Sequence, residues 1–500
     1  MGAFGYLNMN LIYKVIDSIS TNCSGISNGE IRERFEQLYN NEKFRNIINF
    51  SNVERGELYI NLIHYDKNLK NEENTEYYRY FSINIIGSYY AFDDFDMLRL
   101  FISKLNQIPF SSSYILMSSG SESEKVLEEL NKFDFLIEFI IFSKNKDYDY
   151  LKNKYNKVKL IANKFGKITD FLKTKKFSKD DLSMDNHLYI TPLITYYDYK
   201  RCLFPIHKIL AYFFEFSINN FSNDYFLIAK TFINRSVLEI ELKQKILYIM
   251  EDLINYKGNK EFPERCIHYY TGENLCYVFN KALRNFDKFY VEMAYFIGPF
   301  YYGLFKYALD NPQKALSNKA ILYRDLTMER LDLYFYQFCE NDIICFPSFT
   351  STTIDKNLNF QPTNNAININ NNGQLEEKGY VKMIISYDPK GECIPQGLDV
   401  SSESVYSEEK EILLFPFTFL KIDKVEIHSG KENDKHLIFM TIINRGDILE
   451  EGLNKNYSFK LVEDGTKLIV DKENDLKCVD NELYYKMDFK YIKEGCCILI

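Results

Sequence analysis

The chain has 500 residues, too many for one ordinary hydrophobic core, so about two to four domains are expected. A hydrophobic share of 46% and a charged share of 26% are typical of a folded protein. The net charge of -9 argues against a nucleic-acid-binding protein, which needs a basic surface, so no nucleic-acid partner is expected.

The cysteines and the apolar segments narrow the class further. No two of the 10 cysteines form a Cys-x-x-Cys pair, so a zinc ribbon is not expected, and no metal site is predicted. Lys14 and Asp17 interrupt residues 1–20, which therefore lack the apolar run of a signal peptide. A reducing, cytoplasmic location follows as the expectation. The most apolar segment, 293–305, is about half the ~20 residues that span a bilayer, so no transmembrane helix is predicted.

The first part of the chain alternates between strand and helix patterns. Strands are predicted at 58–63, 80–86, 114–117, 135–142 and 158–161, and helices at 94–105, 122–130, 148–155 and 168–172. Alternation of this length predicts a parallel, three-layer α/β sheet. Residues 1–180 are therefore interpreted as an α/β regulatory or targeting domain.

The middle of the chain favours helices, and the part after it favours strands. Apolar residues at helical spacing, at 205–216 and 237–256, indicate that residues 190–260 form a helical connector. A further helix is predicted at 273–286. Strands are then predicted at 320–326, which includes Arg324; at 345–353, which is rich in hydroxyls; and at 409–414.

The last of these strands carries two carboxylates. Side chains alternate along a strand, so Glu409 and Glu411 are expected to project from the same face. A buried charge must be paired or neutralised, which favours a functional site for such a pair. An edge strand with an acidic outer face is the alternative interpretation.

An arginine, a hydroxyl-bearing strand and a Glu-x-Glu, in this order, resemble the mono-ADP-ribosyltransferase family of the R-S-E type. Arg324, in Leu-Tyr-Arg, matches the arginine that holds a phosphate and ribose of NAD. Ser351, in Phe-Thr-Ser-Thr-Thr, matches the serine of the family's Ser-Thr-Ser motif, and Glu411 matches the catalytic glutamate. The resemblance implies that the flanking Tyr323 and Thr352 also line the site for NAD.

The resemblance extends to the choice of acceptor. Glu409 matches the glutamate that marks arginine-modifying members, and Tyr406 stands where the family has a substrate-contacting aromatic. The implied activity is metal-free transfer of a single ADP-ribose from NAD to an exposed arginine of an acceptor protein, with release of nicotinamide. Two features depart from the family: Asp325 replaces a glycine, and Thr353 replaces a third serine. An NAD glycohydrolase, and an inactive scaffold that keeps the fold, are the alternatives.

The resemblance covers residues 262–448 and implies an α+β fold, a split β-sandwich with a helical preface. The preface includes Tyr270-Thr271 and the helix at 280–284.

Residues 452–500 are interpreted as a β-rich tail with strands at 457–461 and 468–470. At its end, Cys497 and the three aliphatic residues after it have the shape of a prenylation box, which would bring the protein to a membrane through a lipid. A buried terminal strand is the alternative.

Overall fold

The chain divides into two compact units, and each is described by itself. In this computed structural model, unit 1 includes residues 193–451 and unit 2 includes residues 53–192 and 452–477. The structure describes, with short gaps, residues 58–177, 194–195, 233–234, 239–284, 297–358, 378–389, 395–428 and 436–443, and the backbone of 456–461 and 468–473. The predicted helix at 205–216 and the proposed lipid site at Cys497 lie outside these residues.

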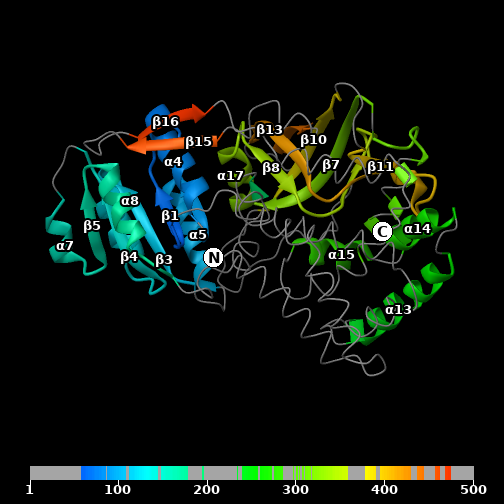
Figure 1. Ribbon diagram of the computed structural model, residues 1–500, viewed down its shortest axis with the longest axis horizontal. Coiled ribbons are helices and arrows are strands. Elements are labelled where there is room, and N and C mark those ends of the chain that lie inside the picture. Colours follow the sequence, from blue (N-terminus) through cyan, green and yellow to red (C-terminus); the bar gives the residue numbers. More distant parts are fainter. Residues whose placement is uncertain are drawn as a thin grey trace. The chain divides into compact units, whose positions relative to one another are not determined.

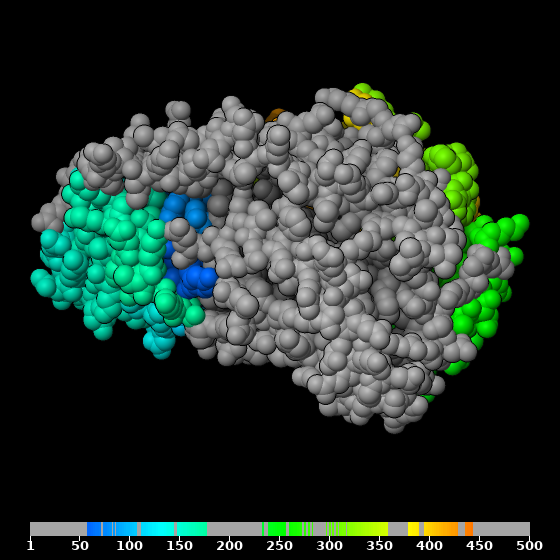
Figure 2. Space-filling view, in the orientation of Figure 1, coloured from blue at the N-terminus to red at the C-terminus, as the bar shows by residue number. Residues whose placement is uncertain are grey.

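Unit 2 contains a five-stranded sheet in the order β2-β1-β3-β4-β5 (Figure 1). Its strands are β1 (Leu62–Tyr65), β2 (Tyr89–Phe92), β3 (Tyr114–Ser119), β4 (Leu136–Phe142) and β5 (Val158–Ala162). Its helices are α4 (Glu72–Asn84), α5 (Phe95–Gln107), the 3-10 turn η1 (Gly120–Glu122), α6 (Ser123–Leu130), α7 (Tyr150–Lys154) and α8 (Phe165–Lys173). All of these strands pair in parallel, so the predicted parallel sheet is confirmed. The teal atoms of the segment around α8 lie on the visible surface of this unit in Figure 2.

One predicted strand of unit 2 is wrong. Residues 80–84 of the expected strand belong to α4, and only an isolated bridge at Ile85 follows. Tyr77, Tyr80 and Phe81 are buried at helical spacing, and the Tyr77 ring stacks on Phe165 with centroids 4.4 Å apart. A short apolar run does not distinguish a strand from a buried helix, and here the helical spacing that begins upstream decides it.

A buried asparagine fastens the loops of unit 2. Asn61 is fully buried at the start of β1. Its Nδ2 donates to the carbonyl oxygen of Ser113 at 3.1 Å, and its Oδ1 accepts from the main-chain nitrogen of Ser88 at 2.8 Å. Asn61 therefore holds the segments that lead into β2 and β3 against β1.

A two-stranded antiparallel sheet follows unit 1 along the chain. It pairs β15 (Asn456–Leu461) with β16 (Leu468–Glu473), and both strands were predicted from the sequence. Residues 452–477 cluster with unit 2.

Unit 1 contains a nine-stranded mixed sheet in the order β11-β12-β9-β7-β10-β14-β13-β8-β6 (Figure 1). Its strands are β6 (Ile194–Thr195), β7 (Ala320–Glu329), β8 (Ile343–Phe346), β9 (Thr350–Thr353), β10 (Lys378–Tyr387), β11 (Gly397–Asp399), β12 (Glu411–Leu414), β13 (Thr418–Glu426) and β14 (His436–Ile443). Its helices include α13 (Ile240–Asn255), α14 (Phe262–Gly272), α15 (Leu275–Arg284), α17 (Arg330–Phe338) and the 3-10 turn η3 (Ser407–Glu409). Helices and a mixed sheet are thus present together in this part of the chain, and the expected split β-sandwich stays a prediction.

Two neighbouring strands of the unit 1 sheet, β7 and β9, are joined by a single residue pair among the described residues. Strand β7 pairs with β10 along the whole of β10, from Lys378 to Tyr387. Its pairing with β9, in contrast, consists of one residue pair, Tyr323 opposite Thr353. The strands that carry the predicted arginine and serine therefore meet where the sheet is held by the fewest main-chain bonds.

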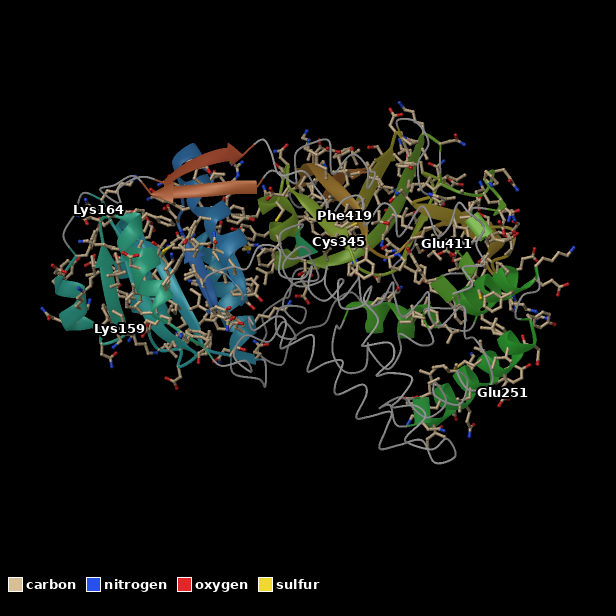
Figure 3. The ribbon with its side chains drawn as sticks, in the orientation of Figure 1. Lys159, Lys164, Glu251, Cys345, Glu411 and Phe419 are labelled. Carbon is tan, nitrogen blue, oxygen red and sulfur yellow. The ribbon has the colours of Figure 1, made fainter. Side chains whose placement is uncertain are left out.

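The predicted hydroxyl-rich strand at 345–353 is two strands. β8 pairs with β13, where Cys345 lies opposite Phe419 (both labelled in Figure 3), whereas β9 pairs with β12. Pro347 follows β8 and has no main-chain N–H to extend the ladder, which accounts for the break. Among the described residues, no helix is long and apolar enough to cross a membrane.

Candidate active site

Ser351 connects the predicted arginine to the predicted catalytic glutamate. In the register of β9 and β12, Thr353 lies opposite Glu411 and Ser351 lies opposite Leu413, so Ser351 and Glu411 are diagonal neighbours on one face. The Ser351 hydroxyl lies on the face of Glu411 and acts to lower the pKa of its carboxylate. The Ser351 carbonyl oxygen accepts a hydrogen bond from Nη1 of Arg324 at 2.5 Å. The structure thus brings Arg324, Ser351 and Glu411 together from three strands.

The Glu411 carboxylate is buried, with 8% of the residue exposed (labelled in Figure 3). Burial raises its pKa above the ordinary value of 4.5, and the nearby charge of Glu409 acts in the same direction. The hydrogen bond from Ser351 and the charge of Arg324 act in the opposite direction but do not cancel the effect of burial. A buried carboxylate with a shifted pKa beside a cation is typical of a functional site.

The neighbours of Arg324 on β7 lie on the other face of the strand. Side chains alternate along β7, so Tyr323 and Asp325 share the face opposite Arg324. Lys382 contacts both: its Nζ is 3.7 Å from Oδ1 of Asp325 and 5.8 Å from the centroid of the Tyr323 ring. Asp325, the departure from the family, is thereby paired with Lys382. The Tyr323 ring, predicted to line the site, does not share the face of Arg324.

The threonines after Ser351 hold the site's main chain. Thr352 is 3% exposed, and its Oγ1 donates to the carbonyl oxygen of Ile412 at 2.7 Å. Thr353 Oγ1 donates to the carbonyl oxygen of Glu409 at 2.9 Å. The sequence assigned Thr352 to the ligand site and gave Thr353 no role, although Thr353 connects β9 to the turn before Glu411.

The expectation that Glu409 and Glu411 project from one face of a strand is wrong. Strand β12 begins at Glu411, and Glu409 ends the 3-10 turn η3. Between them Lys410 adopts a left-handed conformation with φ 47°, which ends the extended backbone, and its Nζ pairs with Asp355 at 3.1 Å. Burial, and then the charge of Glu408, raise the pKa of Glu409.

Tyr406, the other residue predicted to contact the acceptor protein, is exposed at the start of this turn. Tyr406 is 48% exposed and immediately precedes η3. Glu409 lies close enough to Glu411 for its charge to affect the pKa of that residue. Tyr406 and Glu409 therefore lie on an accessible turn beside the buried carboxylate.

Two helical residues join the site without having been assigned to it. Tyr270 of α14 is 3% exposed; burial raises its pKa, and the charges of both Glu411 and Arg324 act on it. Asn280 of α15 places its Nδ2 3.5 Å from the Tyr270 hydroxyl, while its buried Oδ1 has no hydrogen-bond partner among the described residues. Most buried acceptors of this kind are satisfied by the protein or by water, so the Asn280 oxygen is available for a further partner. The sequence identified both residues only as part of the helical preface, because their approach to β12 depends on tertiary packing.

The described residues include no group of three or more His, Cys, Asp or Glu side chains arranged to hold a metal ion.

Comparison with solved structures finds partial likenesses. The Vis toxin, an ADP-ribosyltransferase from Vibrio splendidus, is 15% identical and aligns over 47% of this chain and 97% of its own, with a TM-score of 0.27. The ADP-ribosyltransferase HopU1 of Pseudomonas syringae is 17% identical over 44% of this chain and 98% of its own, with a TM-score of 0.27. Plx2a, an ADP-ribosyltransferase toxin from Paenibacillus larvae, is 14% identical over 41% and 98%, with a TM-score of 0.27.

A scan against models of known protein families finds no match, and a search of curated proteins finds none. Likenesses of this extent do not establish a shared activity.

Proposed function

We propose that this chain transfers a single ADP-ribose from NAD to an arginine side chain of an acceptor protein and releases nicotinamide. The observation that carries the proposal is the position of Ser351, whose carbonyl oxygen accepts a hydrogen bond from Arg324 and whose side chain lies on the same face of the strand pair as the buried Glu411. NAD is a substrate in this reaction, and no metal takes part in the proposed steps.

Arg324, Ser351 and Glu411 suit the first half of the reaction, the departure of nicotinamide from NAD. The planar guanidinium of Arg324 matches phosphate oxygens in a forked, charge-assisted geometry. Departure of nicotinamide builds positive charge on the ribose, as in glycoside hydrolysis. The Glu411 carboxylate would stabilise that charge and hold a ribose hydroxyl, and its burial strengthens the interaction. Ser351 keeps the carboxylate in place.

The turn before β12 suits the second half of the reaction, the transfer of ADP-ribose to the acceptor arginine. Glu409 can pair with an incoming guanidinium and accept its proton, and its raised pKa brings its basicity closer to neutral pH. Tyr406 presents an accessible ring beside it. The attacking guanidinium nitrogen forms the new bond to the ribose carbon as the bond to nicotinamide breaks, and its proton passes to Glu409. Simple hydrolysis gives neither side chain a purpose, which favours transfer to arginine.

Radiolabelled NAD and an arginine-rich acceptor protein test the proposal. The wild type is expected to release nicotinamide and to label the acceptor, and Glu411→Gln is expected to lose both activities. Glu409→Gln is expected to lose labelling while cleavage of NAD in water survives. Asp388→Asn, a change of an exposed carboxylate to which the proposal gives no role, is the control and should retain both.

The outcomes separate the alternatives. Cleavage of NAD with no labelling of arginine acceptors by the wild type would indicate an NAD glycohydrolase. Absence of cleavage in the folded wild type would leave the inactive scaffold and refute both enzymatic functions.

A further inference from the structure

The segment between β11 and β12 forms a loop with a closed base, and we call residues 401–410 the acceptor loop. At the base, the main-chain nitrogen of Val400 donates to the carbonyl oxygen of Glu411 at 3.0 Å. Thr353 adds a hydrogen bond to the carbonyl oxygen of Glu409. The acceptor loop carries Tyr406 and Glu409, so its conformation decides where both side chains stand relative to Glu411.

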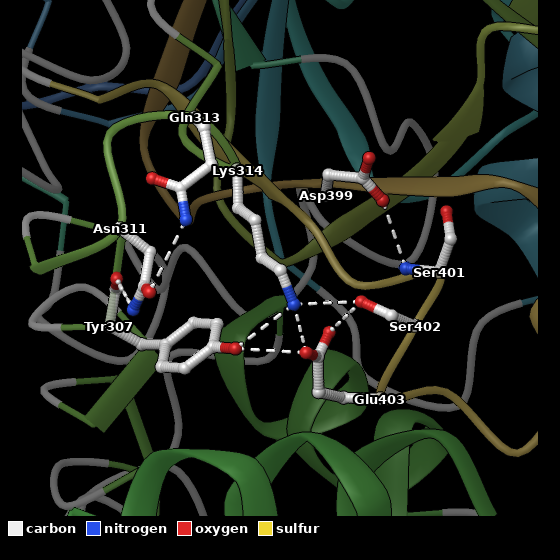
Figure 4. Close-up of polar contacts among 8 residues, drawn as sticks. All are labelled: Tyr307, Asn311, Gln313, Lys314, Asp399, Ser401, Ser402 and Glu403. Carbon is white, nitrogen blue, oxygen red and sulfur yellow. Dashed lines mark hydrogen bonds and ion pairs between the residues drawn. The ribbon is translucent and has the colours of Figure 1, made fainter.

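A cluster of polar side chains grips the first half of the acceptor loop (Figure 4). Lys314 forms an ion pair with Glu403, and its Nζ donates to Ser402 Oγ at 2.7 Å and to the Tyr307 hydroxyl at 3.1 Å. Tyr307 donates to Oε1 of Glu403 at 2.8 Å, and Ser402 donates to Oε2 at 2.8 Å. Both oxygens of the Glu403 carboxylate therefore have polar partners. Lys314 and Tyr307 lie outside the acceptor loop, and Ser402 lies within it.

The partners outside the loop are themselves fixed. The Lys314 carbonyl oxygen accepts from the main-chain nitrogen of Asp399 at 2.7 Å, and Leu316 donates to the carbonyl oxygen of Gly397 at 2.9 Å. The segment around Lys314 therefore runs along β11 as part of the sheet edge. Tyr307 is 7% exposed, so its ring is held by packing.

Burial distinguishes this ion pair from an ordinary surface pair. The side chains of Lys314 and Glu403 are 24% and 13% exposed. Burial opposes both charges, but the hydrogen bonds within the cluster raise the pKa of Lys314 and lower that of Glu403. Both groups are thus charged at neutral pH. Charge-assisted bonds that are partly shielded from water hold a geometry more firmly than an exposed pair does.

The second half of the loop rests against α14. The main-chain nitrogen of Val405 donates to Oγ1 of Thr271 at 3.3 Å. A Cβ atom added at Gly272 would lie 2.6 Å from Cγ2 of Val405, so a side chain at this position requires Val405 to move. Thr271 and Gly272 follow Tyr270, which lies at the candidate active site.

We propose that Lys314, Tyr307 and Glu403 form a latch that sets the position of the acceptor loop and so governs the use of the arginine acceptor. They are positioning residues, because they act through the loop that carries Tyr406 and Glu409. When a loop becomes ordered only on binding, the free-energy cost of ordering it weakens the binding of the acceptor. The latch orders the acceptor loop before the acceptor arrives and so removes this cost. This role rests on the proposed function, since it concerns the acceptor half of the same reaction.

The test compares acceptor use with NAD cleavage in full-length variants. Lys314→Met, Glu403→Gln and Tyr307→Phe each remove one partner of the latch. Each variant is expected to raise KM for an arginine acceptor by about tenfold or more, while the kcat and the KM for NAD cleavage in water stay within about twofold of the wild type. Gly272→Ala, which displaces Val405 from the other side, is expected to show the same division. Lys319→Met is the matched control, since Lys319 is exposed and pairs with Asp388, at 2.9 Å, instead of a loop residue.

Two further readouts make the test independent of labelling. In the Lys314→Met/Glu403→Gln double variant, the effect on the acceptor KM should not exceed that of the larger single change, because both break one interaction. Amide hydrogen exchange of residues 401–410 is expected to accelerate in Lys314→Met and not in Lys319→Met. Thermal unfolding identifies any variant that fails to fold. If Lys314→Met or Glu403→Gln fails, the test rests on Tyr307→Phe, which removes only a hydroxyl.

The possible failures are distinguishable. A wild type that cleaves NAD and labels arginine, with folded latch variants whose acceptor KM is unchanged, would overturn the latch and leave the proposed function standing. A parallel loss of NAD cleavage and labelling would show a general structural role and also overturn it. A wild type without NAD cleavage would refute the proposed function itself, whatever the exchange experiment shows.

Discussion

The side chains of Ser351 and Glu411 are diagonal neighbours on one face of the β9–β12 pair. This relationship depends on register, because a slip of one residue would move the Ser351 side chain to the opposite face of the strand. Thr352 fixes the register from that opposite face through its bond to the Ile412 carbonyl oxygen. The hydroxyls of this strand thus alternate between Ser351, which faces Glu411, and Thr352, which bonds to the main chain of β12.

The first prediction concerns the pH dependence of NAD cleavage. The pKa of Glu411 is raised, so the carboxylate forms at a higher pH than 4.5, and kcat is expected to reach half its maximum above that pH. Ser351→Ala removes a bond that lowers this pKa, so its acid limb should move further upward, with kcat reduced on the order of 10²-fold. A pH profile of nicotinamide release measures both effects. An unchanged acid limb in Ser351→Ala would contradict this account.

The second prediction concerns the free energy of unfolding. Because the folded state raises the pKa of Glu411, the folded protein binds a proton more readily than the unfolded chain does, and stability falls as pH rises through this window. Glu411→Gln removes the buried charge, so its Tm is expected to exceed that of the wild type at pH 7. The difference should disappear below the ordinary pKa of 4.5, where both states are protonated. Thermal unfolding at neutral and acid pH checks the sign.

The third prediction separates two neighbours on β7. Arg324→Lys keeps the charge but loses the planar fork, and kcat/KM for NAD is expected to fall on the order of 10²-fold. Asp325→Asn alters the residue that lies with Lys382 on the other face, and kcat/KM should stay within about threefold of the wild type. A large loss in Asp325→Asn would show that this face also serves NAD.

The fourth prediction concerns unit 2. Asn61→Ala leaves the buried main-chain N–H of Ser88 without its acceptor and frees the segment at Ser113. The free energy of unfolding of the transition that includes this unit is expected to fall by about 2–4 kcal/mol. Asn156→Ala, at an exposed asparagine, is the control and should change it by less than about 0.5 kcal/mol. Urea unfolding compares the two variants.

The sequence predicted unit 2 well because its signals are local. Strands β3, β4 and β5 and helices α5 and α6 begin and end within a few residues of their predicted bounds. Two elements are exceptions: α4, whose apolar run at 80–86 was interpreted as a strand, and β2 (Tyr89–Phe92), which was not predicted.

The candidate site was predicted less completely, because its geometry depends on long-range contacts. Arg324, Ser351 and Glu411 were found from the order of three motifs. Glu409 was placed on the wrong element, since nothing in the sequence marks Lys410 as left-handed. Tyr270, and the cluster around Lys314, come from segments far from β12 along the chain and become neighbours only through tertiary packing.

The single residue pair that joins β7 to β9 has a mechanical consequence. If the sheet bends, we expect it to do so where the fewest residue pairs join neighbouring strands, which among the described residues is the single pair of Tyr323 with Thr353. Residues close to the axis of such a bend are displaced least. Arg324 is adjacent to one member of this pair and Glu411 lies opposite the other, so both stay near the axis. Bending of the sheet would thus displace the outer strands and loops while the distance between these two charges changes little.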